Sequence, residues 1–254
     1  MRALYWTKRA TIAAVGAWLL LAMPVFAASK SEPADPLGSP MWNDRRQQFL
    51  GNEPYVFDPA VVVESQDFAD SPLQVPITVD ASALANVKEI LVFADLNPII
   101  EILRFYPDAT TPYISFRAKL QQTTPVRAAV KTADGVWHLG GKIVNTVGGG
   151  CTAPSLGSAS PEWQQRLNEV TGRTWNVGGM AGRMRFRIIH PMDTGLVAGI
   201  PAFFIETIEV NEESGKRVAH LRLSQPVSEN PVFTLYRGGP ERQLEISGRD
   251  NNGN

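Results

Sequence analysis

Apolar and polar residues alternate through the middle of the chain, a pattern of period two that predicts β-strands with one buried face. Val75, Ile77 and Val79 follow it, and residues 90–93 form the continuous apolar run of a strand buried on both faces. The clearest case is segment 114–121, where apolar and polar residues take turns: Ile114, Ser115, Phe116, Arg117, Ala118, Lys119, Leu120 and Gln121. Residues 126–130 then lead to Ala133-Asp134-Gly135, a hairpin signal, with a return strand over 137–147.

A second β region follows later in the chain. Met184, Phe186 and Ile188 alternate with arginines, and further apolar segments cover 203–210, 218–223, 232–236 and 244–246. The two regions have about 70 to 90 residues each, the size of a small antiparallel sandwich. We therefore predict an all-β protein with two immunoglobulin-like β-sandwich domains in tandem, joined by a Gly-rich loop and a short helix.

Two short helices are expected beside the strands. Ser39-Pro40 offers a cap and a first-turn proline for a helix that ends at Gly51 and packs on the next domain. Ser160-Pro161 can start another, with Trp163, Leu167 and Val170 on one stripe and Gly172 at its end.

The first segment has the pattern of an export signal. Arg2, Lys8 and Arg9 precede an apolar stretch over 10–23, and Ala27 suits cleavage after a small residue. The stretch is shorter than the roughly 20 residues of a membrane span, so we expect cleavage near Ala27 and a periplasmic protein without a stable membrane anchor. The pattern leaves open the Sec and twin-arginine routes.

These patterns together predict five segments. They are a signal peptide (1–27), an N-terminal extension with a short helix (28–60), a first β-sandwich (61–147), a glycine–cysteine arm with a helical linker (148–180) and a second β-sandwich (181–250).

The composition narrows the class of partner. The chain has 254 residues, with 24 Lys and Arg against 25 Asp and Glu, and a formal net charge of −1. This balance gives no excess of positive charge that would attract nucleic acid or an anionic membrane. The sequence also lacks a P-loop, a Gly-x-Ser-x-Gly elbow, a Cys-x-x-Cys pair and a His-rich cluster. We therefore expect neither an enzyme nor a bound cofactor or metal.

One cysteine in an exported protein is unusual, because exported proteins normally use cysteine in pairs. Cys151 follows three glycines, Gly148, Gly149 and Gly150, which have no side chains to bury and the greatest backbone freedom. We predict a mobile arm that carries the thiol outside the folded body, with the three glycines as its hinge.

Three other groups of residues have structural interpretations that we favour over chemical ones. His190 and Met192 could offer soft metal ligands across a proline, but a turn is the simpler reading. The row Arg183, Arg185 and Arg187 could attract an anionic group or lower the pKa of a nearby thiol, but a solvated strand face explains it as well. Asp95 and Glu101 flank Asn97-Pro98 and are expected in a turn with solvated charges rather than as an acid/base pair.

Two regions of the chain resemble known proteins. The first region resembles SoxY in two motifs, Ile90-Leu91-Val92-Phe93-Ala94-Asp95-Leu96-Asn97-Pro98 and Gly148-Gly149-Gly150-Cys151. The second region resembles SoxZ in three motifs, Ile189-His190-Pro191-Met192-Asp193-Thr194-Gly195, Ile200-Pro201-Ala202-Phe203-Phe204-Ile205 and Val227-Ser228-Glu229-Asn230-Pro231. The chain thus resembles a fusion of the two subunits of the SoxYZ sulfur-carrier family, of the type associated with quinoprotein dehydrogenases.

The resemblance implies a function for the arm. It implies that Cys151 carries sulfur intermediates covalently, as in thiosulfate oxidation, and that Gly148, Gly149 and Gly150 form the hinge. It also implies that the partners are periplasmic sulfur-oxidation enzymes or a quinoprotein dehydrogenase system. In SoxY the arm ends the chain, whereas this chain continues through Thr152-Ala153-Pro154 and lacks the following glycine. Two alternatives stay open: a scaffold for a quinoprotein dehydrogenase with no covalent cargo, and a thiol enzyme, for which no resolving cysteine is present.

Overall fold

The computed structural model describes residues 33–155, 161–177, 181–238 and 243–254. The predicted signal peptide lies outside the described residues. Over the described ranges the chain forms these elements in order: α1 Trp42–Phe49, β1 Tyr55–Phe57, β2 Val62–Ser65, β3 Phe68–Ala69, β4 Val75–Asp80, β5 Val87–Ala94, β6 Glu101–Tyr106, β7 Tyr113–Ala118, β8 Thr124–Thr132, β9 Trp137–Thr146, α2 Pro161–Gln165, β10 Val170–Val177, β11 Ala181–Ile188, β12 Ile205–Glu212, β13 Arg217–Leu223, β14 Val232–Gly238 and β15 Leu244–Asp250.

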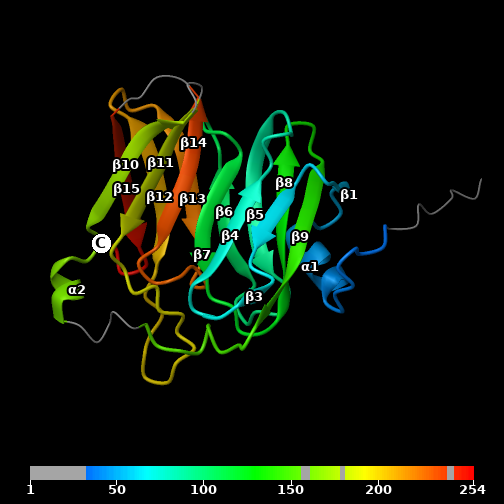
Figure 1. The fold of residues 1–254 in the computed structure, drawn as a ribbon, viewed down its shortest axis with the longest axis horizontal. Helices are drawn as coiled ribbons and strands as arrows, with labels where there is room; N and C mark the ends of the chain where they lie inside the picture. The colour runs from blue at the N-terminus through cyan, green and yellow to red at the C-terminus, as the bar shows by residue number, and fades with distance from the viewer. Residues whose placement is uncertain (1–32, 156–160, 178–180, 239–242) are drawn as a thin grey trace, which may run out of the picture. The chain divides into compact units, whose positions relative to one another are not determined.

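The strands form two sheets packed face to face, as the alternating pattern predicts (Figure 1). Within the described ranges the first sheet has nine strands, in the order β1-β9-β8-β5-β6-β13-β12-β15 with β3 beside β9, and the second has six, in the order β10-β11-β14-β7-β4-β2. The all-β, immunoglobulin-like class is thereby confirmed.

Both sheets run continuously through the two predicted sandwiches. β6 of the first region pairs antiparallel with β13 of the second, with Phe105 opposite Leu221. In the other sheet β7 pairs with β14, with Ile114 opposite Leu235. One hydrophobic cluster contains buried residues from both regions. The two halves are therefore joined edge to edge within residues 33–254, which form one compact unit.

The N-terminal extension packs on the outside of the first sheet. In α1 and just after it, Trp42 and Leu50 are buried, and they form a second hydrophobic cluster with Phe93, Trp137 and other residues of β5, β8 and β9. The helix begins at Trp42 rather than at Pro40, because Ser39 accepts a hydrogen bond from Met41 N (3.3 Å) before the first helical turn. The predicted packing of this helix on the first β region is confirmed.

The helical linker differs from the prediction. α2 spans only Pro161–Gln165, and Val170 begins strand β10 instead of continuing a helical stripe. β10 pairs with β11 along its length, with Val170 opposite Ile188. Gly172 sits where a Cβ would lie 3.0 Å from Phe186 Cβ, so the close approach of the two strands favours glycine there. Antiparallel pairing with the next strand, β11, overrides the helical prediction, since a helix stripe and a short strand can share apolar spacing.

Candidate functional site

The single cysteine lies in the loop that leaves strand β9. Two glycines of this loop, Gly148 and Gly149, adopt φ of 87°, a left-handed conformation that L side chains rarely take. The sequence therefore needs glycine here for the path of the chain. The loop turns back at Cys151, where Thr152 N donates a hydrogen bond to Gly149 O (3.3 Å).

The glycines also anchor the loop to the segment that follows β7. Gly149 N donates to Gln121 O (2.9 Å), and Gly150 N donates to Leu120 O (3.0 Å). At Gly150 an added Cβ would lie 2.1 Å from Pro72 O, so only glycine permits this approach. Cys151 N completes the set by donating to Gln121 Oε1 (3.2 Å).

The thiol is fully buried. Cys151 is 0% exposed, and its Sγ donates a long hydrogen bond to Lys119 O (3.6 Å). Across from it, the Thr194 hydroxyl donates to Cys151 O (2.6 Å). The prediction of a thiol standing outside the folded body is wrong for this conformation. Glycine lacks a side chain to bury, but its backbone N–H groups and its small volume allow it to dock.

Burial sets the protonation of the thiol. It raises the pKa of Cys151 from 9.0 to about 11, and the nearby Lys119 ammonium only partly opposes this. Lys119 is itself buried, and its pKa is lowered by desolvation. Its Nζ donates to Met192 O. In the docked loop Cys151 is a neutral thiol at pH 7, and the thiolate that nucleophilic chemistry needs is a minor form.

Both halves of the chain build this site. Lys119 and Gln121 follow β7 of the first half, whereas Met192 and Thr194 come from the segment between β11 and β12 of the second. The periodic pattern predicted Lys119 on a solvated face, but β7 ends at Ala118 and Lys119 N turns to Pro226 O (2.6 Å). Sequence reasoning missed Lys119, Gln121 and Thr194 as contacts of the cysteine. Thr194 lay in the motif 189–195, which was the available signal.

The loop between β5 and β6 supports the surface on which the arm docks. Asn97, which is buried, donates from Nδ2 to Lys119 O (3.0 Å), and its Oδ1 accepts from Gln121 N (2.9 Å). The Asn97 side chain thus fixes Lys119 and Gln121, two of the residues that contact Cys151. The motif Asp95-Leu96-Asn97 therefore shapes the docking surface.

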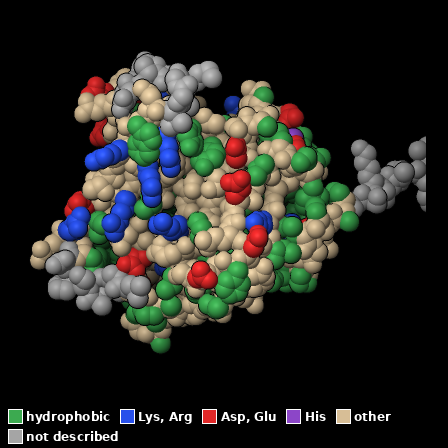
Figure 2. Space-filling view, in the orientation of Figure 1, with side chains coloured by type: hydrophobic (Ala, Val, Ile, Leu, Met, Phe, Trp, Pro, Cys, Tyr) green, Lys and Arg blue, Asp and Glu red, His purple; other side chains and the backbone are tan. Residues whose placement is uncertain are grey.

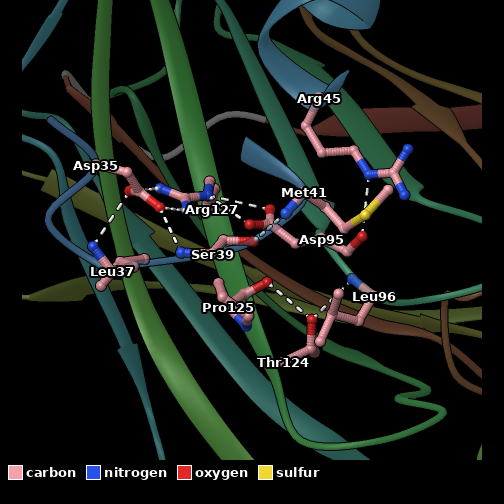
Figure 3. A network of polar contacts seen from close by, with 10 residues as sticks. All are labelled: Asp35, Leu37, Ser39, Met41, Arg45, Asp95, Leu96, Thr124, Pro125 and Arg127. Atoms are coloured by element: carbon pink, nitrogen blue, oxygen red, sulfur yellow. Dashed lines mark hydrogen bonds and ion pairs between the residues drawn. The ribbon is translucent and has the colours of Figure 1, made fainter. Parts of the chain in front are cut away.

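A buried charge network holds the same loop from the other side (Figure 3). Arg127 Nε contacts both carboxylate oxygens of Asp95 at 3.0 Å, and its two terminal nitrogens bond Asp35 at 2.8 and 2.7 Å. The guanidinium also lies over the Trp42 ring, 4.5 Å from its centre. Asp35 in turn accepts from Ser39 N (2.7 Å). The N-terminal extension is thereby tied to the core through Arg127.

Asp95 was expected to be solvated, and that prediction is wrong. It is 0% exposed, and burial raises its pKa although Arg127 opposes the rise. Glu101 does not join it; its carboxylate bonds Arg104 (3.1 and 3.0 Å). The two carboxylates are therefore not an acid/base pair.

His190 and Met192, considered above as soft metal ligands, instead accept hydrogen bonds from backbone N–H groups. His190 Nδ1 accepts from Met192 N (3.1 Å), and Met192 Sδ accepts from Ile205 N (3.4 Å). Met192 has φ of 53°, as a tight turn requires. Burial lowers the pKa of His190 to about 4, so its ring is neutral at pH 7. In the described part of the chain, three or more His, Cys, Asp or Glu side chains nowhere gather in a metal-binding group.

Two family models match the chain in tandem. Residues 46–151 match sulfur oxidation protein SoxY, and residues 176–254 match sulphur oxidation protein SoxZ. The chain belongs to the SoxYZ family. The SoxY match ends at Cys151, and the SoxZ match covers β11 to β15. The family makes this protein a sulfur-oxidation carrier in which the two partners form one polypeptide.

Other comparisons add little. Among solved structures, the sulfur carrier protein SoxY from Chlorobium limicola f thiosulfatophilum shares 20% identity, over 42% of this chain and 96% of that chain, with a TM-score of 0.37. That similarity is too low to bear on function. No match was found among curated proteins. In the described part of the SoxYZ chain, no helix has the length and apolarity needed to cross a membrane.

Proposed function

We propose that this protein is a periplasmic carrier that holds sulfur-containing intermediates covalently on Cys151 and presents them to partner enzymes. One observation carries the proposal. The only cysteine of the sequence is the last residue of the SoxY match, and it sits in a glycine loop held between the two halves by a small set of hydrogen bonds.

Cargo transfer requires the loop to leave its docked position, because a fully buried neutral thiol cannot attack a donor. The contacts to be broken are the hydrogen bonds of Gly149 N, Gly150 N and Cys151 N, and the bond from Thr194. In the open loop these groups bond water instead, so each bond opposes opening by only about 1 kcal/mol. Gly148, Gly149 and Gly150 act as the hinge.

A persulfide is the donor that we propose for loading. In the open loop the Cys151 thiolate attacks the outer sulfur of the donor. A new S–S bond forms on Cys151, and the S–S bond of the donor breaks. The transferred sulfur keeps its proton as the Cys151 persulfide, and the donor leaves as a thiolate that takes up a proton from water. No net oxidation occurs. The partner enzymes perform the further chemistry, and the carrier alone has no turnover.

The family and the first segment support the proposed location and partners. Residues 1–27 have the composition of a cleavable export signal, which supports a periplasmic site of action. Sulfur-oxidation enzymes are the partners that the family favours, and a quinoprotein dehydrogenase system is the second choice.

Intact mass spectrometry tests the loading. The mature protein is incubated with a low-molecular-weight persulfide and compared with Cys151→Ser. We expect the wild-type mass to rise by one sulfur atom, to return after reduction, and to stay constant in the variant. An unchanged wild-type mass, with the thiol shown to be free by alkylation of the unfolded chain, contradicts the carrier function.

The buried thiol favours one second candidate, an accessory protein for a quinoprotein dehydrogenase in which Cys151 is a small apolar residue at the junction of the halves. Cys151→Ser separates the two functions in vivo. A carrier loses its phenotype with this substitution, whereas an accessory protein keeps both its phenotype and its partner in a pull-down.

A further inference from the structure

Arginines gather on the outer face of strands β10 and β11. Met184, Phe186 and Ile188 of β11 point into the core, so the residues between them, Arg183, Arg185 and Arg187, face outward. Arg173 of β10 joins them because it lies opposite Arg185. In the space-filling view, Lys and Arg side chains collect on the left part of the face, over β10, β11 and β14 of Figure 1 (Figure 2).

These arginines have no carboxylate within ion-pair distance in the part of the chain that the structure describes. None of the four forms an ion pair with a carboxylate there, and Glu169, just before β10, bonds Arg166 (2.7 Å). Arg183 stacks on Trp175, with its guanidinium 5.1 Å from the ring centre, and its buried Nε has no hydrogen-bond partner. The solvated-face interpretation does not account for this last group.

The pairing of Arg173 with Arg185 is unfavourable in the free protein. Like charges directly opposite each other on neighbouring strands destabilise a sheet. An opposing carboxylate surface removes this repulsion and gains charge-assisted hydrogen bonds from the planar guanidinium groups. The arrangement is therefore better suited to a bound state than to solvent.

The neighbouring strand supplies no opposite charge. The outward residues of β14 are Val232, Thr234 and Tyr236. Among the described residues, Glu169 just before β10 is the carboxylate near the row; it bonds Arg166 and also interacts electrostatically with Arg187. Asp80 of β4 and Glu64 of β2 lie farther across the sheet. With four arginines against this one carboxylate, the arginine end of the face has an excess of positive charge.

The surface has the composition of a protein interface. A shallow hollow of about 340 Å³ is lined by Arg173, Trp175, Arg185, Arg187 and neighbouring residues. Arginine and tryptophan are enriched where protein partners bind most tightly. The chain as a whole has a net charge of −1, which gives no long-range attraction to an anionic bilayer.

The surface also leads toward the cysteine. β11 runs from Arg183 to Arg187 and continues into the segment that supplies Met192 and Thr194 to the site. A protein docked on the arginine row therefore lies along the strand that ends at the junction where Cys151 is held.

We propose that Arg173, Arg183, Arg185 and Arg187, with Trp175, form a docking surface for a carboxylate-rich surface of a partner protein. The arginine surface recognises the partner by charge and by guanidinium–carboxylate hydrogen bonds. It is independent of what Cys151 carries, so its test and the test of cargo loading can fail separately.

An oligoglutamate peptide is the probe, titrated into the full mature chain at low ionic strength and followed by tryptophan fluorescence and calorimetry. The test variant is R173Q/R185Q/R187Q, which changes three exposed arginines of the surface. The matched control K88Q/K216Q/R222Q removes the same charge from exposed residues on other strands and loops. Thermal unfolding of both variants checks that they fold.

We expect the test variant to bind the peptide about tenfold more weakly than wild type, and the control to change its affinity by less than about twofold. Binding should weaken steeply as salt rises to roughly 0.3 M, because exposed charges are screened. Equal loss in both variants, or no binding by wild type, overturns the proposal. Binding to phosphatidylglycerol vesicles that depends on these arginines, without binding to the peptide, overturns it in favour of a membrane. Persulfide loading of Cys151 should be the same in all three proteins.

Discussion

Thr194 donates its hydroxyl hydrogen to the carbonyl oxygen of Cys151 across 2.6 Å, and in doing so bonds the SoxZ half to the arm of the SoxY half. Both residues are buried. The junction between the halves thus takes part directly in holding the cysteine, and the strength of this contact bears on how often the thiol is exposed.

Replacing Thr194 by Val should release the arm more often. The change removes one buried hydrogen bond worth about 1 kcal/mol, so the open fraction should rise roughly fivefold. The rate at which Cys151 reacts with an aromatic disulfide reagent measures this fraction. Thr194→Ser keeps the hydroxyl and should react like wild type, and Thr171→Val, on the exposed face of β10, is the surface control. An unchanged rate in Thr194→Val would show that the bond does not restrain the arm.

Gly150→Ala tests whether the docked loop requires the small volume of glycine at this position. The new Cβ would lie 2.1 Å from Pro72 O in the docked loop, whereas the open loop has room for it. We expect a faster reaction of Cys151 with the same reagent and little change in the overall melting temperature. Gly238→Ala is the matched control, because a Cβ there meets nothing within 4 Å. A Gly150→Ala protein with a thiol as slow as that of wild type would mean that the arm docks elsewhere.

The raised pKa of Cys151 predicts a loss of stability at alkaline pH. The buried thiol keeps its proton up to about pH 11, while the exposed thiol of the unfolded chain ionises near 9.0. The unfolded state then binds fewer protons, so the free energy of unfolding falls as pH rises through this window, by up to roughly 3 kcal/mol. The lowered pKa of Lys119 acts in the opposite sense, but it is present in both proteins compared.

Chemical denaturation of wild type and Cys151→Ser between about pH 8 and 11 provides the measurement. The difference between their unfolding free energies should be nearly constant up to about pH 8 and should move against wild type as pH rises through 9 toward 11. Parallel pH profiles for the two proteins would place the thiol in water instead of in the interior.

Arg127→Met should destabilise the first half strongly. The substitution leaves the Asp95 carboxylate buried without its cation and frees Asp35, which breaks a buried ion pair at a cost of about 3 kcal/mol. Urea denaturation gives the value, and Arg222→Met, an exposed residue of β13, should change it by less than about 0.5 kcal/mol. A small loss for Arg127→Met would mean that Asp95 takes up a proton and is no longer charged.

The alternating pattern was enough to predict the strands, because period two reports directly on which face of a strand is buried. It predicted β4 and β11 within a residue or two, and it predicted β7 with an end three residues too late. It could not predict that Phe105 faces Leu221 across the two halves, since strand partners distant in sequence leave no local signal. Val170 was assigned to a helix for a different reason: its apolar spacing with Trp163 and Leu167 also fits a helical stripe.

The sequence identified the cysteine and the glycines of the site, but it did not predict the residues that surround them. Cys151 and its glycines stood out because of composition, whereas the partners that bury them, Lys119 and Thr194, are ordinary residues in ordinary segments. Asp95 was misjudged because its counter-ion, Arg127, lies 32 residues away. Such nonlocal pairs decide burial, and burial decides the pKa of both Asp95 and Cys151.

The SoxY and SoxZ halves, which pair through β6 with β13 and β7 with β14, belong to one polypeptide. Each molecule of this carrier therefore always contains both halves. An assembly of separate chains comes apart on dilution and can exchange one chain for a paralogue. Here covalent continuity makes the effective concentration of one half around the other independent of expression level. A cell that contains several carriers of this family can therefore keep this one free of mixed assemblies, with every arm matched to the same second half from synthesis to degradation.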